Sequence, residues 1–195
     1  MSATASSCAA VVKFGGSVLT DKKQFESIDD RSFALCIRLA SQLPPQSCIV
    51  HGAGSFGHFH AARYNVKAGA SACNAPGGEQ HPKGWGMCDT RRSVLKLNSM
   101  VSSALMDAHK SATPVHPMDS WSSSDAVISS ADLTCVQRCL QQGITPVLHG
   151  DVIFDSCRGY TVLSGDDIVQ QLASRLRPPF VVFVSDVPGV FLEPP

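Results

Sequence analysis

The feature that most constrains the fold of this chain is a repeated alternation of short apolar runs with longer amphipathic stretches. The apolar runs cover residues 9–14, 48–50, 113–116, 144–148 and 180–184, and stretches with helical spacing of apolar residues separate most of them. Strands that alternate with helices favour a parallel sheet, because each helix carries the chain back to the starting edge. The sequence therefore predicts an α/β fold, a three-layer αβα sandwich with a mostly parallel central sheet.

The ends of several predicted elements are marked by glycine and proline. One helix stops before Pro44, and another closes at Gly143, which suits the left-handed position that follows a helix. A long helix is expected over residues 86–108, and residues 152–163 predict a β-hairpin. Residues 67–85 are rich in Gly, Ala, Pro and Lys, a composition typical of a mobile surface loop.

Composition excludes some classes of function. Of the 195 residues, 44% are hydrophobic, and Lys plus Arg and Asp plus Glu both number 16. A chain with no net charge lacks the excess positive charge of proteins that bind nucleic acids or membrane surfaces, so we expect neither partner. No apolar run reaches the ~18 residues of a membrane span. The eight cysteines form no CxxC pair, which indicates reduced, buried thiols in a cytoplasmic protein.

Four polar, glycine-bearing turns follow predicted strands. They are GGS at residues 15–17, HGAGSFGH at 51–58, HGD at 149–151 and SDVPG at 185–189. In open α/β sheets, ligands bind beyond the carboxyl ends of the strands, where such turns meet. The turns therefore predict a ligand site at one edge of the sheet.

The first two turns have the chemistry of phosphate binding. Glycines let the backbone N–H groups approach an anion, and Lys13 precedes the first turn as a point cation. His58 would lie in the first turn of a helix that opens from the second loop. A plain turn and a surface or capping histidine are the alternatives. Neither loop matches the GxxxxGK[ST] pattern, which excludes a P-loop kinase. Ser164 and Asp167 have the spacing of a helix capping box, which is a structural alternative for that aspartate.

The turns together carry a family resemblance. KFGGSVLTDK, HGAGSFGH, HGDV, YTVLSGDDI and SDVPGVF occur in this order and resemble the amino acid kinase superfamily. Within it, GSFGH is similar to the isopentenyl phosphate kinases. The resemblance implies an amino acid kinase-like fold and the ATP-dependent phosphorylation of isopentenyl phosphate to isopentenyl diphosphate. It also implies ATP and Mg²⁺ as cofactors, a small phosphate monoester as partner, and a homodimer.

The resemblance further implies a domain division and a set of site residues. Residues 1–178 would form an acceptor-binding lobe, and residues 179–195 the start of a nucleotide-binding lobe whose remainder is absent. The implied catalytic residues are Lys13, Lys22, His58 and Asp167, with Asp166 as the alternative carboxylate. The implied substrate-binding residues are Ala53, His58 and Gly150. The implied nucleotide-binding residues are Lys13, Gly15, Gly16, Ser17, Gly54, Asp186 and Gly189. No metal-ligating side chain is predicted.

One residue departs from the family pattern. Ala53 stands where the family usually has glycine, and its methyl group is compatible with the loop only if its φ is negative. Two other functions remain open at this point. One is a kinase of the same fold with another small phosphate or phosphonate acceptor. The other is a catalytically silent binding or dimerisation module, since family members continue beyond the point where this chain stops.

Overall fold

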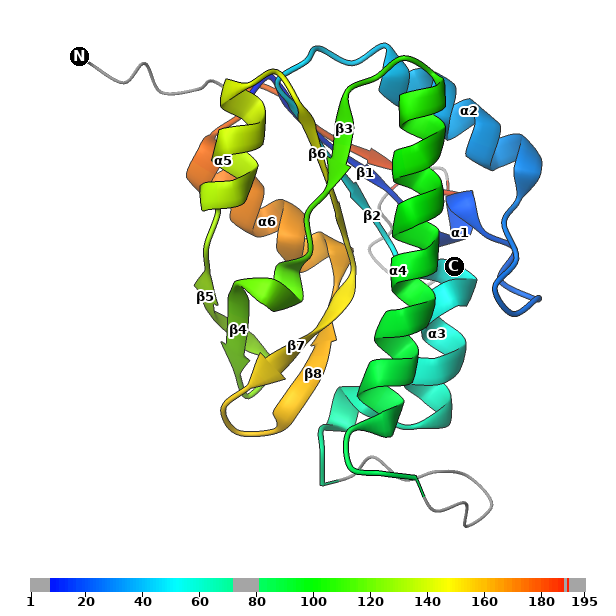
Figure 1. The fold of residues 1–195 in the computed structure, drawn as a ribbon, viewed down its shortest axis with the longest axis vertical. Helices are drawn as coiled ribbons and strands as arrows, with labels where there is room; N and C mark the ends of the chain where they lie inside the picture. The colour runs from blue at the N-terminus through cyan, green and yellow to red at the C-terminus, as the bar shows by residue number, and fades with distance from the viewer. Residues whose placement is uncertain (1–7, 72–80, 188, 190–195) are drawn as a thin grey trace.

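A five-stranded parallel sheet forms the centre of the molecule (Figure 1). The computed structural model describes residues 8–71, 81–187 and 189. The strand order is β3-β6-β2-β1-β9, and all the pairings are parallel. The strands are β1 (Ala10–Phe14), β2 (Ser47–His51), β3 (Ala112–Pro114), β6 (Thr145–His149) and β9 (Val181–Val184).

Helices cover both faces of this sheet. On one face lie α1 (Gly16–Leu19), α2 (Asp30–Ser41), α3 (Gly54–Arg63) and α4 (Trp85–Asp107), and on the other lie α5 (Thr134–Gln141) and α6 (Gly165–Leu176). Alternate strand residues feed the two cores, as the period of a strand requires. Val11 and Val50 join the core under α5 and α6, whereas Val12 and Ile49 join the core under α2 and α4. The predicted three-layer sandwich is therefore confirmed.

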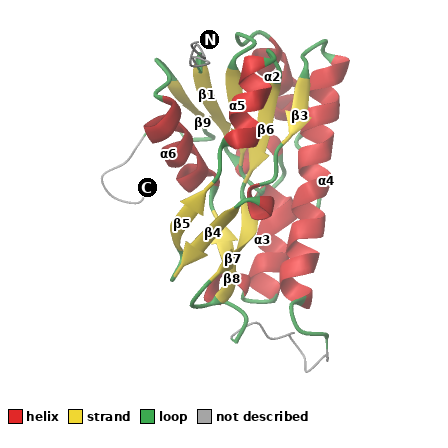
Figure 2. Cartoon of the chain, turned by 60° about the vertical axis from the view of Figure 1, so that its left-hand side comes forward, coloured by secondary structure: helices red, strands yellow, loops and turns green. Residues whose placement is uncertain are grey.

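A second, four-stranded sheet lies beyond the carboxyl end of β6 (Figure 2). Its order is β5-β4-β7-β8, with β4 (Trp121–Ser124), β5 (Val127–Ala131), β7 (Asp151–Asp155) and β8 (Gly159–Leu163). The predicted hairpin of residues 152–163 is confirmed as the antiparallel pair β7–β8. The pair β4–β5 was not predicted. Only one residue, Gly150, separates β6 from β7, so the small sheet is held directly against the strand ends of the large one.

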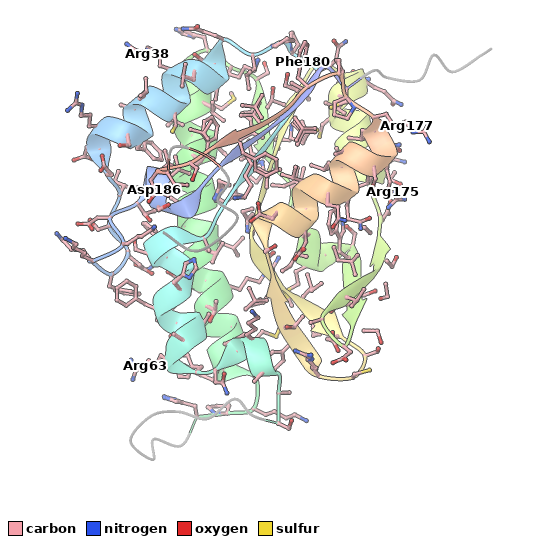
Figure 3. The ribbon with its side chains drawn as sticks, turned by 180° about the vertical axis from the view of Figure 1, so that it is seen from behind. Arg38, Arg63, Arg175, Arg177, Phe180 and Asp186 are labelled. Atoms are coloured by element: carbon pink, nitrogen blue, oxygen red, sulfur yellow. The ribbon has the colours of Figure 1, made fainter. Side chains whose placement is uncertain are left out.

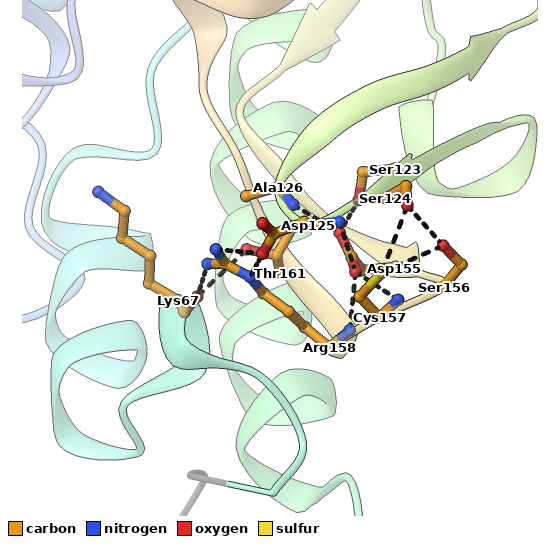
Figure 4. A network of polar contacts seen from close by, with 10 residues as sticks. All are labelled: Lys67, Ser123, Ser124, Asp125, Ala126, Asp155, Ser156, Cys157, Arg158 and Thr161. Atoms are coloured by element: carbon orange, nitrogen blue, oxygen red, sulfur yellow. Dashed lines mark hydrogen bonds and ion pairs between the residues drawn. The ribbon is translucent and has the colours of Figure 1, made fainter.

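A network of polar contacts fixes the far tip of the small sheet (Figure 4). Asp155 accepts hydrogen bonds from the Ser123 hydroxyl and from four backbone N–H groups of the two neighbouring turns. The Arg158 guanidinium forms an ion pair with Asp125 at 2.7 Å. Arg158 also donates to the carbonyl of Lys67 in η1 (Val66–Ala68), the turn that follows α3. The network therefore ties both hairpins of the small sheet to the end of α3.

Element boundaries mostly follow the sequence signals. Gly143 adopts the left-handed conformation after α5, with φ 69°, and α6 begins at a Ser164 cap as predicted. The predicted loop of residues 67–85 includes the end of η1 and the first residue of α4, and its residues 72–80 lie outside the described residues. In the described part of the chain, no helix is both long and apolar enough to cross a membrane.

The prediction of buried cysteines holds for only part of the set. Cys8, Cys36, Cys48 and Cys139 are buried, whereas Cys88, Cys135 and Cys157 are exposed. The described cysteines are all free thiols. The exposed ones lie on the outer faces of α4 and α5 and in the β7–β8 turn, where apolar periodicity does not report burial.

Candidate active site

A cavity of about 240 Å³ opens where the ends of β1 and β2 meet the small sheet and the start of α6. It brings together five residues that the sequence predicted, which are Lys13, Gly16, Ala53, His58 and Gly150, and also Asp166, which the sequence offered as the alternative carboxylate. Its other lining residues are Gly52, Gly57, Ala61, Thr90, Val94, Asp151, Val162, Leu163, Ser164 and Gly165. The cavity therefore lies at the strand ends, as expected for a parallel sheet.

The floor of the cavity is bare backbone, because the two glycine loops interlock. A Cβ on Gly16 would lie 2.4 Å from the nitrogen of Gly54, and a Cβ on Gly52 would lie 2.6 Å from the nitrogen of Gly16. Such distances exclude any side chain at these positions. Gly54 also has φ 51°, in the left-handed region that glycine tolerates. The glycines thus let the loops after β1 and β2 touch and present main-chain N–H groups side by side.

Ala53 fits this loop without strain. Its backbone is helical, with φ −72° and ψ −25°. The φ is therefore negative, as an alanine at this position requires. Its methyl group fills the space beside the next helical turn, where a Cβ on Gly57 would lie 2.4 Å from it. A side chain at Ala53 therefore requires glycine at residue 57.

Lys13 enters the cavity from the end of β1. Its ammonium lies 3.3 Å from Asp166 Oδ1, and its side chain is only 14% exposed. The start of α6 leaves room for it, since a Cβ on Gly165 would lie 3.1 Å from Lys13 Cε. Asp167, the carboxylate named from the sequence, instead accepts a hydrogen bond from the Ser164 hydroxyl at 2.7 Å, and its backbone N–H donates to that hydroxyl, which caps α6. The carboxylate beside Lys13 therefore belongs to Asp166.

His58 stands on α3 at the mouth of the cavity. It is exposed and lines the wall, so it is not a core histidine. His58 was predicted to lie in the first turn of this helix. Because α3 begins at Gly54, His58 lies in the second turn instead. The N-terminal end of α3 carries the partial positive charge of the helix dipole and faces the same space as Lys13. The cavity therefore has a cationic end suited to an anion.

Four other predicted residues gather on the β9 side of β1. The Lys22 ammonium lies 3.0 Å from Asp186 Oδ2, and Gly15 donates its N–H to the carbonyl of Val184 at 2.9 Å. The Lys22 ammonium, helped by the Ser17 hydroxyl, holds the pKa of Asp186 below its usual range. Figure 3 shows Asp186 beside α1. These residues do not line the cavity, so the loop after β1 separates two polar clusters.

Two further predicted residues have simpler surroundings. Gly54 lies between the clusters, in contact with the first glycine loop. Gly189 is exposed, and no described atom lies within 4 Å of the position that its Cβ would take. Pro188, Val190 and Phe191 of the last motif are outside the described residues, as are residues 192–195.

Sequence reasoning missed two buried histidines beneath the cavity. His51 and His149 end β2 and β6, are fully buried, and stack with ring centroids 5.8 Å apart. In each, the ring Nδ1 lies 3.0 Å from the carbonyl of the following glycine. Burial lowers the pKa of each histidine to about 4. The signal in the sequence was the dipeptide His-Gly, which occurs at both strand ends.

A buried carboxylate accompanies these histidines. Asp151 lines the cavity, and burial raises its pKa to about 6. Its Oδ2 lies 3.8 Å from His149 Nε2, and its Oδ1 lies 3.6 Å from Arg91 Nε. His116 completes the group, with its Nδ1 3.0 Å from His149 Nε2. The cavity floor is thus backed by a buried polar network.

Comparison with known proteins identifies the family. The model of the amino acid kinase family matches residues 9–195. An isopentenyl phosphate kinase from Arabidopsis thaliana is 42% identical over 148 residues, which are 75% of this chain and 42% of that protein. One from Methanothermobacter thermautotrophicus is 35% identical over 191 residues, which are 95% of this chain and 70% of that protein. The chain therefore spans less than half of the plant relative and about two thirds of the archaeal one.

Solved structures agree with the sequence relatives. An isopentenyl phosphate kinase structure superposes with a TM-score of 0.84 at 32% identity, covering 93% of this chain and 73% of that one. A product complex of the T. acidophilum isopentenyl phosphate kinase superposes with a TM-score of 0.80 at 28% identity, covering 96% of this chain and 74% of that one. On its sequence, its fold and these relatives, the chain belongs to the amino acid kinase family, among the isopentenyl phosphate kinases.

Proposed function

We propose that this chain binds isopentenyl phosphate and ATP and transfers a phosphoryl group to form isopentenyl diphosphate. The observation that carries the proposal is the cavity itself, in which Lys13 and His58 stand over the interlocked backbone of two glycine loops. Its relatives are named isopentenyl phosphate kinases, and one solved relative is described as a substrate complex of that enzyme. Phosphate chemistry and family membership therefore support the same activity.

The shape of the cavity suits an acceptor with a charged head and an apolar tail. Lys13, His58 and the start of α3 form the polar end, where the acceptor phosphate would bind. Ala61, Val94 and Leu163 also line the cavity, and these apolar side chains would contact the prenyl chain. Beyond them, buried Tyr64, Val66, Met87, Val152 and Tyr160 form a small hydrophobic core. Burying the tail against the apolar lining of the cavity would contribute roughly 0.8 kcal/mol of binding free energy per CH₂ group.

The cluster on the β9 side would receive the donor. Lys22, Ser17 and Asp186 lie across the loop after β1 from the acceptor cavity. With ATP on that side, its terminal phosphate would approach the acceptor over Gly16, and the Lys13 ammonium would stand close to both. This arrangement supports the predicted division into an acceptor lobe of residues 1–178 and the start of a nucleotide lobe at residues 179–195.

The proposed reaction is dominated by charge. Both reactants are phosphates, so their mutual repulsion must be offset before they can meet in line. The Lys13 and Lys22 ammonium groups and the loop N–H groups would provide that compensation in a site already shaped for it. The second pKa of a phosphate monoester is ~6, so the acceptor oxygen is already deprotonated near neutral pH. A general base is therefore not needed, and positioning is the main task of the protein.

Mg²⁺ would accompany ATP in this proposal. Among the described residues, no three His, Cys, Asp or Glu side chains converge as metal ligands. A magnesium ion held mainly by the phosphates of the nucleotide fits this arrangement, since Mg²⁺ commonly uses substrate phosphates and waters as ligands. The cytoplasmic location and the homodimer predicted from the sequence remain predictions.

A panel of acceptors tests the proposed function. The chain would be incubated with Mg²⁺, ATP labelled in its terminal phosphate, and isopentenyl phosphate, a shorter alkyl phosphate or a phosphonate such as fosfomycin. We expect label in isopentenyl diphosphate at a kcat/KM at least tenfold above that of the other acceptors. Preferred labelling of the phosphonate would instead support a kinase of the same fold with another acceptor. A chain that binds acceptor but transfers no label would support the silent binding module.

A further inference from the structure

Two histidines at the centre of the sheet have no part in the proposed chemistry, yet both lie directly behind the phosphate loops. His51 and His149 are register partners in β2 and β6 and are fully buried. Burying a polar side chain costs free energy of folding unless its hydrogen bonds are satisfied. The hydrogen bonds that these two rings make therefore indicate their structural role.

The ring of each histidine holds the peptide group that follows its own strand. His51 Nδ1 lies 3.0 Å from the carbonyl oxygen of Gly52, and His149 Nδ1 lies 3.0 Å from that of Gly150. A carbonyl oxygen can only accept, so Nδ1 carries the proton in both rings. His51 Nε2 lies 3.0 Å from Oδ1 of Asn98, and Nδ2 of the same amide has no hydrogen-bond partner among the described residues. The oxygen and nitrogen of an amide are assigned from the hydrogen-bond network, and turning this amide over brings Nδ2 to the ring. In that orientation Nδ2 donates to Nε2, and the Nδ1–H tautomer of His51 is satisfied on both sides.

Fixing the Gly52 carbonyl also fixes the next N–H group. In a planar trans peptide, the C=O and the N–H point in opposite directions. With the Gly52 carbonyl turned toward the buried ring, the N–H of Ala53 turns away from the core. Ala53 and Gly150 both line the cavity, and the nitrogen of Ala53 lies 3.7 Å from the position that a Cβ on Gly150 would take. Among the described residues, the N–H of Ala53 has no hydrogen-bond acceptor.

We propose that His51 is a positioning residue that aims the N–H of Ala53 at the acceptor phosphate by holding the Gly52 carbonyl in the core. His149 stacks on the His51 ring and braces the peptide after Gly150 in the same way. This inference rests on the proposed function, because it assumes that a phosphate occupies the cavity. It assigns a role to residues that touch neither reactant and act only through the backbone.

The two amide side chains closest in shape to histidine give a matched test. In His51→Asn, the amide nitrogen takes roughly the position of Nδ1 and can still donate to the Gly52 carbonyl. In His51→Gln, the amide reaches the position of Nε2 and leaves that carbonyl without its donor. Both variants keep a polar group in the buried site. Calorimetric titration with inorganic phosphate and with isopentenyl phosphate would be compared for the two variants and the wild-type chain.

We expect His51→Gln to bind both ligands at least tenfold more weakly than the wild-type chain, and His51→Asn to recover most of that loss. The amide NMR signal of Ala53 should shift on phosphate addition in the wild-type chain and less in His51→Gln. Equal affinities for the two variants would refute the positioning role. A wild-type chain that binds neither ligand would refute the proposed function as well, so the two failures are distinguishable.

A second measurement needs no variant and so does not depend on the folding of one. Imidazole ¹⁵N NMR of the wild-type chain reports which ring nitrogen carries the proton. We expect His51 and His149 to be neutral with the proton on Nδ1 at pH 7. A proton on Nε2 of His51 would mean that the ring does not donate to Gly52, and the inference would be overturned.

Discussion

His58 is the exposed residue of α3 that brings a ring nitrogen donor to the mouth of the cavity. We expect His58→Ala to raise the KM for isopentenyl phosphate by roughly 10–100-fold, because a hydrogen bond to a charged group contributes about 1.5–3 kcal/mol. The KM for ATP should stay within about twofold. Steady-state kinetics with each substrate varied in turn would measure both. Phe59→Ala, which truncates the exposed neighbour on the same helix, is the control. A change confined to the ATP KM would mean that the acceptor site is misplaced.

The buried histidines also predict how stability depends on pH. Burial lowers the pKa of His51 and His149 from the usual value of about 6.5 to about 4. Between these values the unfolded chain binds more protons, so the free energy of unfolding falls as the pH falls. Asp151 acts in the opposite direction, because its pKa is raised to about 6. Each group contributes about 3 kcal/mol, at 1.36 kcal/mol per pKa unit.

The effect of the two histidines exceeds the opposite effect of the one aspartate. The free energy of unfolding should therefore fall by about 3 kcal/mol between pH 7 and pH 4. Urea unfolding at several pH values in this range would measure it. His149→Asn removes one of the titrating groups and should flatten the curve. A free energy of unfolding that stays constant or rises on acidification would contradict the neutral, buried state of these rings.

At the scale of single residues, the sequence located five of the residues that line the cavity but not the buried histidines beneath it. Lys13, Gly16, Ala53, His58 and Gly150 were named from local motifs and do meet in the cavity. The choice between two adjacent aspartates could not be made from sequence, because it depends on the direction of each side chain at the start of α6. The buried role of the His-Gly pairs also escaped prediction, since a polar residue at a strand end does not reveal which way it faces.

The link between the tip of the small sheet and the end of α3 is the element-scale feature that ties together two elements that line the cavity. Asp155 accepts five hydrogen bonds at the tip of that sheet, and these bonds hold the pKa of its carboxyl well below the usual range. Asp155→Asn replaces one accepting oxygen with a donor and leaves N–H groups unpaired. We expect it to lower the free energy of unfolding by about 2–4 kcal/mol, measured by urea unfolding.

A matched substitution separates the buried contacts from the exposed ones in this network. Asp125→Ala removes the ion pair with Arg158 but leaves the carboxylate of Asp155 in place. Because the Asp125 side chain is 74% exposed, we expect a loss of only about 0.2–1 kcal/mol. Equal effects for the two variants would mean that Asp155 does not organise the tip of the sheet.

Among the elements, those with strong periodicity were predicted and those without it were not. The strands of the central sheet and the helices α2, α4, α5 and α6 carry clear apolar patterns and lie close to their predicted positions. The strands β4 and β5 read WSSS and VISSA, which have little apolar alternation. Their pairing with each other and with β7 depends on contacts distant in the sequence, which local patterns cannot report.

At the scale of the whole molecule, two polar clusters flank the loop after β1, one for each reactant of the proposed transfer. Lys22 belongs to the cluster on the β9 side and is 64% exposed. We expect Lys22→Ala to lower kcat by roughly a hundredfold, as for a lost transition-state donor, with little change in acceptor affinity. Lys23→Ala, at the exposed neighbouring position, should keep kcat within about twofold. An unchanged kcat for Lys22→Ala would exclude it from the transfer step.

The proposed function depends on the cavity recognising a phosphate, and calorimetric titration of the chain tests this most directly. We expect isopentenyl phosphate to bind with a dissociation constant between about 1 μM and 1 mM, the usual range for enzyme substrates. Isopentenol, which has the same tail without the phosphate, should bind at least a hundredfold more weakly. Raising the salt concentration should weaken the binding of isopentenyl phosphate but not that of isopentenol. Equal binding of the two compounds, or no binding of isopentenyl phosphate, would contradict the account.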